Sequence, residues 1–231
     1  MAWRCTGTTN AELIANLRKA ALIKSPLVLD AMTRVDRAHY APRSAYEDSP
    51  QQIGYGATIS APHMHAAACE SLLPYLKRGS KVLDVGSGSG YLTAVLAECL
   101  GEGEGGGKVV GIDHIQGLVD MSRANMLKSP RGKELLESGR VELVCGDGRK
   151  GWPAEAPYDA IHVGAAARIL HEELIEQLKC PGRMFIPVDD GDGRFFPFRQ
   201  CPILDIVPTP ITVLARMLAE SIEFCHAAHH R

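Results

Sequence analysis

The sequence lacks a charge excess of one sign, a long apolar run and a leader-like N-terminus. Its 231 residues carry 25 Lys and Arg against 27 Asp and Glu, a net charge of -2 that gives no reason to expect a nucleic-acid partner. No apolar run approaches the roughly 20 residues that cross a bilayer. The N-terminus has neither an apolar signal core nor Gly at position 2 for myristoylation. We therefore expect a cytosolic protein with no membrane and no nucleic acid among its partners.

Cysteines spaced as CxxC are also lacking. The seven cysteines are scattered along the chain, which indicates neither a zinc site nor a disulfide framework. Reduced thiols in the cytosol are the simplest interpretation, because disulfides are rare there. His63 and His65 flank Met64, but no third ligand stands at a sensible spacing, so we expect no metal. We expect a hydrogen-bonding role for His65 and a structural one for His63.

The first third of the chain predicts helices and one irregular segment. Thr9 to Glu12 has the spacing of a capping box, and apolar residues follow at helical intervals. Ser25-Pro26 predicts the start of a second helix. Residues 40–61 are rich in Pro, Ser, Gly and Gln and predict an irregular segment. A helix is expected from Pro62 to about Leu76.

From Lys81 onward, short apolar strands alternate with helices. We expect strands over 81–85, 108–112, 141–145, 158–163 and 183–188, and helices over 91–100, 115–128 and 169–179. Apolar strands that alternate with helices indicate a parallel sheet covered on both faces. The predicted fold class is α/β, with a doubly wound, mostly parallel sheet and an N-terminal helical extension.

The densest signal is the glycine turn from Asp84 to Gly90, which follows a strand and precedes a helix. Glycines allow a sharp turn and the close approach of a ligand. The spacing is GxGxG rather than the GxGxxG of dinucleotide sites, and Asp84 would repel a pyrophosphate. The ammonium of S-adenosylmethionine would be attracted by this carboxylate or by water bound to it.

Two further carboxylates follow the next two strands. Asp113 ends the second strand, where an acid accepts hydrogen bonds from ribose hydroxyls. Asp147 follows the third strand, where its carboxylate could reach an adenine amino group. Each of these residues could simply be a turn residue, as Asp often is. Three at successive strand ends beside a glycine turn favour a ligand site.

Several segments of this chain resemble protein-L-isoaspartate (D-aspartate) O-methyltransferases. The resemblance covers residues 1 to about 188, and the segment Ile59 to Met64 (ISAPHM) is specific to that family. The matching segments are 48–54, 57–65, 84–90, 111–114, 146–149 and 156–164. The resemblance implies the doubly wound sheet of S-adenosylmethionine-dependent methyltransferases, over a domain 1–188 with a helical extension 1–77. It also implies methylation of the free carboxyl of L-isoaspartyl residues and, more weakly, of D-aspartyl residues, the first step of protein repair.

The resemblance also implies roles for individual residues. Ser60 matches the active-site serine beside the substrate carboxylate. Asp113 matches the ribose ligand, and Asp147 with Gly148 the adenine contact. The positions implied to bind the cofactor are Ala57, Thr58, Ile59, Ser60, His65, Asp84, Val85, Gly86, Ser87, Gly88, Asp113, His114, Asp147 and Gly148. Isoaspartyl proteins and peptides are the implied partners, and we expect a monomer.

The chemistry of the implied reaction needs little from Ser60. An isoaspartyl carboxyl has a pKa of about 4 and is already an anion at pH 7, so no strong base is needed. We expect Ser60 to orient this carboxylate by a hydrogen bond rather than to act as a covalent nucleophile. The main demands on the protein are alignment of the reacting atoms and exclusion of water.

The resemblance stops at Asp189, and residues 189–231 form a divergent C-terminal segment. Pro208 and Pro210 are unfavourable in a central strand. Residues 211–225 have helical periodicity instead. One hypothesis is an alternative splice product or a mispredicted reading frame. Three functions therefore stay open: a repair methyltransferase, a cofactor-binding protein with lost or reduced activity, and a small-molecule methyltransferase.

Overall fold

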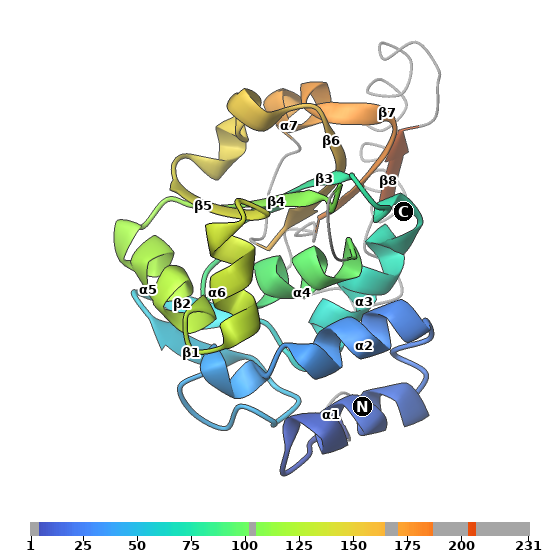
Figure 1. Ribbon diagram of the computed structural model, residues 1–231, viewed down its shortest axis with the longest axis vertical. Coiled ribbons are helices and arrows are strands. Elements are labelled where there is room, and N and C mark those ends of the chain that lie inside the picture. The colour runs from blue at the N-terminus through green and yellow to red at the C-terminus, as the bar shows by residue number, and fades with distance from the viewer. Residues whose placement is uncertain (1–4, 102–104, 165–170, 187–202, 207–231) are drawn as a thin grey trace, which may run out of the picture.

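The computed structural model describes residues 5–101, 105–164, 171–186 and 203–206. Helices and strands alternate along most of this part of the chain (Figure 1). The helices are α1 (Asn10–Lys19), α2 (Pro26–Arg34), α3 (Pro62–Leu72), α4 (Tyr91–Cys99), α5 (Gln116–Met126), α6 (Pro130–Glu137) and α7 (Glu172–Glu176). The strands are β1 (Gln51–Gly54), β2 (Ala57–Ile59), β3 (Lys81–Val85), β4 (Lys108–Asp113), β5 (Val141–Cys145), β6 (Tyr158–Val163), β7 (Leu178–Phe185) and β8 (Ile203–Ile206). Short 3-10 helices are η2 (Arg37–His39), η3 (Leu73–Tyr75), η4 (Gly148–Lys150) and η5 (Pro153–Glu155).

The main sheet has the order β5-β4-β3-β6-β7-β8. The five strands from β5 to β7 pair in parallel, and β8 pairs antiparallel with β7 at the edge. The order reverses between β3 and β6, which is the point where ligands bind in open α/β sheets. This arrangement confirms the predicted doubly wound, mostly parallel sheet.

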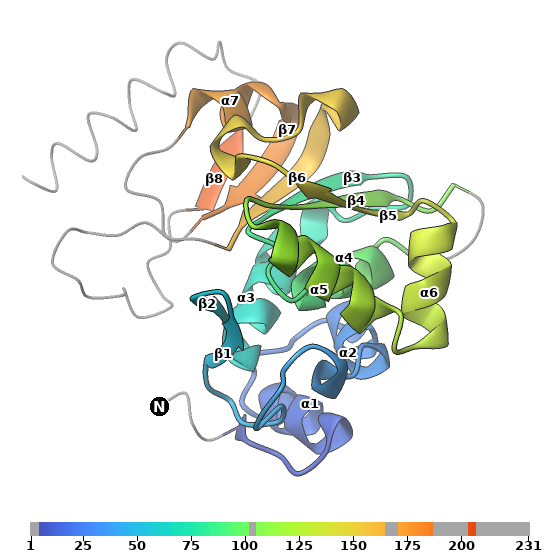
Figure 2. The same ribbon diagram turned by 90° about the vertical axis from the view of Figure 1, so that its left-hand side faces the viewer.

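Apolar side chains on the two faces of the sheet belong to two separate cores. Val82 and Val109 point to the core that includes α1 to α6, whereas Leu83 and Val110 point to the core that includes Leu174 of α7. The alternation follows from the two-residue period of a strand. Figure 2 shows α4, α5 and α6 on one side of the sheet, with α1 and α2 forming a further layer beyond them. The predicted coverage of both faces is confirmed.

The helix starts expected near the N-terminus are confirmed, with one change at the first cap. The Thr9 hydroxyl accepts a hydrogen bond from the Glu12 N–H, but the Glu12 carboxylate binds Thr8 instead of returning to Thr9. Ser25 caps α2 through the N–H of Val28, as its position before a proline predicts.

The irregular segment predicted over 40–61 is wrong in part, because β1 and β2 form a hairpin there. Its tip, Tyr55-Gly56, has positive φ at both residues, 53° and 72°, the geometry of a type I′ turn. Gly56 is usual at the second position of such a turn, but Tyr55 stands at the first, where asparagine or glycine is expected, so the two-residue turn signal is incomplete. Figure 2 shows the hairpin between the N-terminal helices and the sheet.

Three other element boundaries differ from the predictions. Helix α6 was not predicted, although Ser129 caps it and Pro130 is its first residue. The helix expected over 169–179 ends at Glu176, and β7 begins at Leu178 rather than near 183. Strand β8 stands in the segment thought to depart from the fold. The helix expected over 211–225 lies outside the described residues.

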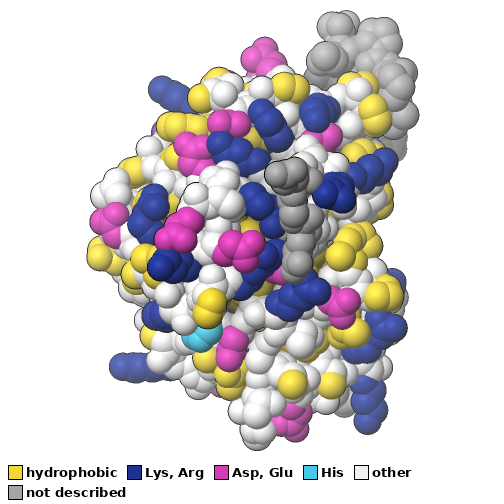
Figure 3. Space-filling view, viewed as in Figure 1, with side chains coloured by type: hydrophobic (Ala, Val, Ile, Leu, Met, Phe, Trp, Pro, Cys, Tyr) yellow, Lys and Arg dark blue, Asp and Glu magenta, His cyan; other side chains and the backbone are white. Residues whose placement is uncertain are grey.

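The surface carries charges of both signs. On the face shown in Figure 3, Lys and Arg side chains lie next to Asp and Glu side chains. One such group joins Lys108 to Glu142 and Glu155 at 2.7 and 2.6 Å. Within the described part of the chain, no helix has the length and apolar character that a bilayer crossing requires.

Candidate active site

Strands β3, β4 and β5 end side by side at one edge of the sheet. Val85 pairs with Ile112, and Asp113 pairs with Cys145. Because the strands are parallel, the segments that follow them lie together. We call these segments, residues 84–90, 113–114 and 146–148, the rim. The three carboxylates singled out in the sequence all belong to it.

The glycine turn of the rim is held by its backbone. The N–H groups of Gly86 and Ser87 both donate to the carbonyl of Ile112, at 2.8 and 3.1 Å. Positive φ angles of 78°, 53° and 83° occur at Gly86, Gly88 and Gly90. A Cβ at Gly90 would also lie 2.9 Å from the Cβ of Ser122 in α5. The turn therefore needs glycine for its conformation and for the close packing of α5.

Asp113 joins the ends of β3 and β4. Its carboxylate accepts hydrogen bonds from the N–H groups of Gly88 at 3.0 Å and Ile115 at 3.2 Å. The side chain is buried, and the exposed ring of His114 lies 3.5 Å away. Asp113 is thus a turn residue, as the simpler interpretation held. A carboxylate has about four acceptor sites, so it retains capacity for ribose hydroxyls.

Asp84 is buried behind the turn, with partners on both oxygens. Thr93 donates its hydroxyl proton to one oxygen at 2.5 Å, and Nδ1 of His162 lies 2.8 Å from the other. The His162 ring stacks on Phe185, with centroids 5.9 Å apart. The predicted attraction for an ammonium would therefore act through remaining lone pairs, water or His162 rather than through a free carboxylate.

Asp147 is bound by its neighbour Arg149. The guanidinium donates to both carboxylate oxygens, at 2.9 and 2.8 Å, and the Arg149 N–H donates at 3.1 Å. These hydrogen bonds lower the pKa of Asp147 to about 2. A Cβ at Gly148 would lie 2.5 Å from Val85, so this backbone packs directly on the end of β3. The predicted adenine contact would share a carboxylate that already has a cationic partner.

Residues 36–65, which we call the covering segment, lie against the rim. The Cδ1 atom of Ile53 is 3.4 Å from the position of a Cβ at Gly88. The ring of Tyr55 lies over Gly117, where a Cβ would stand only 2.4 Å from it. Ala57, Thr58 and Ile59 form β2 of this segment, and Ser60 follows. The hairpin thus brings the predicted active-site serine to the glycine turn's side of the molecule.

Ser60 and His65 share one buried partner, Arg37. Its guanidinium donates to the Ser60 carbonyl at 2.8 Å and lies 3.2 Å from Nδ1 of His65. Burial is the main cause that holds the pKa of His65 well below 6.5, and the charge of Arg37 adds to it. Since Arg37 can only donate, Nδ1 of the neutral His65 ring accepts and Nε2 carries the proton. The expected hydrogen-bonding role of His65 is present.

His63 belongs to a different pair. Its Nδ1 lies 2.7 Å from the buried carboxylate of Asp48, which also accepts from the His63 N–H at 3.0 Å. The two histidines thus face different partners. No cluster of three metal-ligating side chains occurs among residues that the structure describes.

Comparison with known proteins decides what this arrangement represents. The family model for protein-L-isoaspartate (D-aspartate) O-methyltransferases matches residues 8–200. This chain belongs to that family. The match extends beyond residue 188, where the sequence resemblance was expected to end. It includes the rim and the covering segment.

Individual relatives show the same similarity. A protein-L-isoaspartate O-methyltransferase of Caenorhabditis elegans is 52% identical over 194 residues, 84% of each chain. Such a protein of Archaeoglobus fulgidus is 46% identical over 184 residues, 78% of each chain. A Plasmodium falciparum structure assigned to this activity, in complex with S-adenosyl-L-homocysteine, has a TM-score of 0.74 and 35% identity. It covers 79% of this chain and 85% of its own. The chain is a protein-L-isoaspartate O-methyltransferase that uses S-adenosylmethionine.

Within this methyltransferase, the predicted site residues form two groups. The rim holds Asp84, Val85, Gly86, Ser87, Gly88, Asp113, His114, Asp147 and Gly148, and the covering segment holds Ala57, Thr58, Ile59, Ser60 and His65. Sequence reasoning missed Arg37 and His162. A polar His162 between the apolar residues Ile161 and Val163 of β6 was a usable signal, because buried polar groups need partners. Arg37 stands in a polar stretch and gave none.

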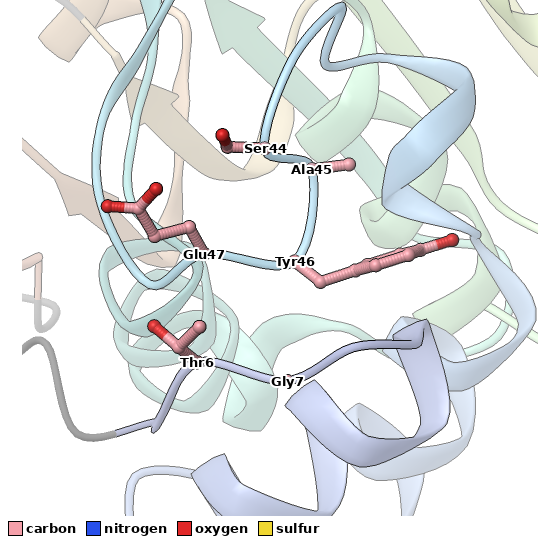
Figure 4. A pocket seen from close by; sticks show the side chains of 6 residues that line it. All are labelled: Thr6, Gly7, Ser44, Ala45, Tyr46 and Glu47. Carbon is pink, nitrogen blue, oxygen red and sulfur yellow. The ribbon is translucent and has the colours of Figure 1, made fainter.

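The methyltransferase has a cavity of about 490 Å³ near its N-terminus (Figure 4). Residues 6–7 and 44–47 line it, and the Gly7 N–H donates to the Tyr46 carbonyl at 3.0 Å across these segments. The Tyr46 hydroxyl donates to Asp36 at 3.0 Å. This cavity belongs to the N-terminal layer and is distinct from the rim.

Proposed function

We propose that the chain methylates the free carboxyl of L-isoaspartyl residues, and more weakly that of D-aspartyl residues, in damaged proteins and peptides. The observation that carries this proposal is the family match over residues 8–200, which includes both the rim and the covering segment. The proposed partners are isoaspartyl proteins and peptides, bound by a monomer. The expected compartment is the cytosol.

The rim has features that fit S-adenosylmethionine. The Ser87 hydroxyl is buried and has no hydrogen-bond partner among the residues described, so a donor or acceptor is available in the glycine turn. The glycines of this turn adopt positive φ and carry no side chain, so a ligand can approach their backbone closely. We propose that the turn holds the methionine end, Asp113 the ribose, and the segment from Asp147 the adenine.

In the proposed reaction, the main task of the protein is to position the reacting groups. S-adenosylmethionine, when bound, supplies an electrophilic methyl group on a positively charged sulfur. Ser60 donates a hydrogen bond that orients the substrate carboxylate, which needs no base because it is ionised at pH 7. The hairpin of the covering segment excludes water from both charges. Positioning of this kind contributes roughly 7–11 kcal/mol in favourable systems. In solution, the neighbouring backbone nitrogen then attacks the carbonyl carbon of the methyl ester, so that a succinimide forms and methanol leaves.

The test is a methylation assay with matched peptides. One peptide carries L-isoaspartate and the other normal aspartate at the same position, with a labelled methyl donor. We expect label only in the first, and about a tenfold loss of kcat/KM in Ser60→Ala, the size of one hydrogen bond to a charged group. Donor binding without methylation of the isoaspartyl peptide would support the alternative of a binding protein without activity. Methylation of small molecules alone would support the other alternative.

A further inference from the structure

Arg37 is a buried cation that the mechanism above does not use. It is the largest fully buried side chain of the described residues, with 0% exposure. Burial lowers the pKa of Arg37 to about 10, which leaves it protonated at pH 7. A buried charge is energetically unfavourable unless it is paired, so a fully buried arginine indicates that its charge has a function.

The direct contacts of Arg37 are all with uncharged groups. Its guanidinium donates to the Ser60 carbonyl at 2.8 Å, faces Nδ1 of His65 at 3.2 Å, and lies 5.1 Å from the ring centroid of Tyr91. The Arg37 Nε is buried without a hydrogen-bond partner among the residues described. Among the described residues, the guanidinium therefore has hydrogen-bond partners but no anion in direct contact.

The carboxylate near Arg37 has another partner. Asp48 is fully buried and bonds to His63 at 2.7 Å, and the burial of the Cys5 thiol next to it raises that thiol's pKa. Asp48 acts on Arg37 through space, without a hydrogen bond between the two. The positive charge next to Ser60 is therefore only partly neutralised.

The position of Arg37 is fixed from the N-terminal layer. Its backbone N–H donates to the side chain of Asn10 in α1 at 3.4 Å. The same side chain donates to the carbonyls of Met32 and Thr33 at the end of α2. The backbone of Arg37 is thus tied to α1 and α2, while its guanidinium contacts the loop that carries Ser60.

We propose that Arg37 is a positioning residue that fixes the Ser60 backbone and gives the substrate site a buried positive charge, which selects an anionic carboxylate over a neutral side chain. The proposal rests on the proposed function, because it takes Ser60 as the residue beside the substrate carboxylate. The proposal also predicts the effect of Arg37 on cofactor affinity. Its positive charge repels a positively charged methyl donor, so removal of the charge does not weaken cofactor binding.

The test uses two peptides that differ only in charge. One carries L-isoaspartate and the other L-isoasparagine, its neutral amide. Affinities are measured by calorimetry with S-adenosyl-L-homocysteine present, which requires no turnover. The variants are Arg37→Gln, which keeps a donor for the Ser60 carbonyl but removes the charge, and Arg37→Lys, which keeps the charge.

We expect the wild type and Arg37→Lys to prefer the isoaspartyl peptide, and Arg37→Gln to lose about tenfold of that preference. The affinity for S-adenosyl-L-homocysteine stays within about twofold in both variants. If Arg37 had a purely structural role, Arg37→Gln would lower the affinity for both peptides equally, and this result would overturn the proposal.

Folding is followed by circular dichroism. If Arg37→Gln does not fold, Arg37→Lys decides, because loss of the charge preference despite a retained charge would also contradict the proposal. Failure of the proposed function looks different: the wild type would then leave the isoaspartyl peptide unmethylated, whatever its charge preference in binding.

Discussion

The rim and the covering segment, the two halves of the proposed active site, are built in different ways. The rim relies on backbone: parallel strand ends, glycines with positive φ, and N–H groups that donate to carbonyls and to Asp113. The covering segment relies on buried side chains, which join Arg37 to Ser60 and His65, and Asp48 to His63. The first half is formed by local geometry and the second by contacts between distant elements.

This difference assigns different tasks to the two halves. A backbone turn at a sheet edge offers donors to any nucleoside-like ligand, which suits a cofactor. A network of buried, charged side chains can be specific for the charge and shape of a substrate. Variants of the rim should therefore alter the affinity for the cofactor, whereas variants of the covering segment should alter the response to the peptide.

The largest effect is expected for Asp113→Asn. The Gly88 and Ile115 N–H groups bond to different oxygens of Asp113. Asn replaces one of these oxygens by an NH2 group that only donates, so one hydrogen bond and the negative charge of the turn are lost. Hydrogen bonds to charged groups contribute about 1.5–3 kcal/mol, so the affinity for S-adenosyl-L-homocysteine should fall roughly 10- to 100-fold. Calorimetry measures this change directly.

The matched control is Asp120→Asn in α5, because this carboxylate is exposed and, among the described residues, bonds to Gln116 alone. Its affinity for the cofactor product should equal that of the wild type. If Asp113→Asn changed only the KM for the peptide, the division of tasks between rim and covering segment would be wrong.

A smaller effect, confined to acid pH, is expected from His65 in the covering segment. Burial and the nearby Arg37 hold the pKa of His65 well below 6.5 in the folded protein. The unfolded chain therefore binds a proton below pH 6.5 that the folded protein does not, so stability is lost as the pH falls below 6.5. Urea unfolding should show that the free energy of unfolding falls less between pH 7 and pH 5 in His65→Gln than in the wild type.

The control for this experiment is His39→Gln, because the His39 side chain is only half-buried, whereas that of His65 is buried. That variant should lose as much stability on acidification as the wild type. An unchanged pH dependence in His65→Gln would mean that the buried ring is not the source, and the contrast with the rim would lose its support at this residue.

The rim could be predicted from the sequence, because its signals are local. Glycines and carboxylates next to apolar strands stand within a few residues of one another, and the parallel sheet brings the strand ends together. The network of the covering segment could not be predicted in the same way. Arg37 is 23 positions from Ser60 and 28 from His65. The one rim contact that was missed, between Asp84 and His162, is likewise distant, at 78 positions.

The fold shows the same division between local and distant information. The glycine turn and the strands around it were predicted closely, because apolar runs and turn residues coincide there. The hairpin over 51–59 was missed, because its strands are short and Tyr55 stands where a glycine or asparagine is usual. Its conformation depends on packing against Gly88 and Gly117, which the local sequence does not encode.

The smallest effect is expected for Asp147→Asn, the rim position that already has a charged partner. Arg149 holds the pKa of Asp147 at about 2, so the carboxylate stays ionised and bound to the guanidinium down to acid pH. An adenine amino group would add one hydrogen bond to a carboxylate that Arg149 already binds. Loss of that hydrogen bond should weaken S-adenosyl-L-homocysteine binding by about 2- to 10-fold, the range for a single hydrogen bond.

Arg149→Met is the matched variant. It frees the Asp147 carboxylate, so cofactor affinity should stay equal or increase. A greater loss in Arg149→Met than in Asp147→Asn would show that the guanidinium, rather than the carboxylate, is the group that the cofactor contacts.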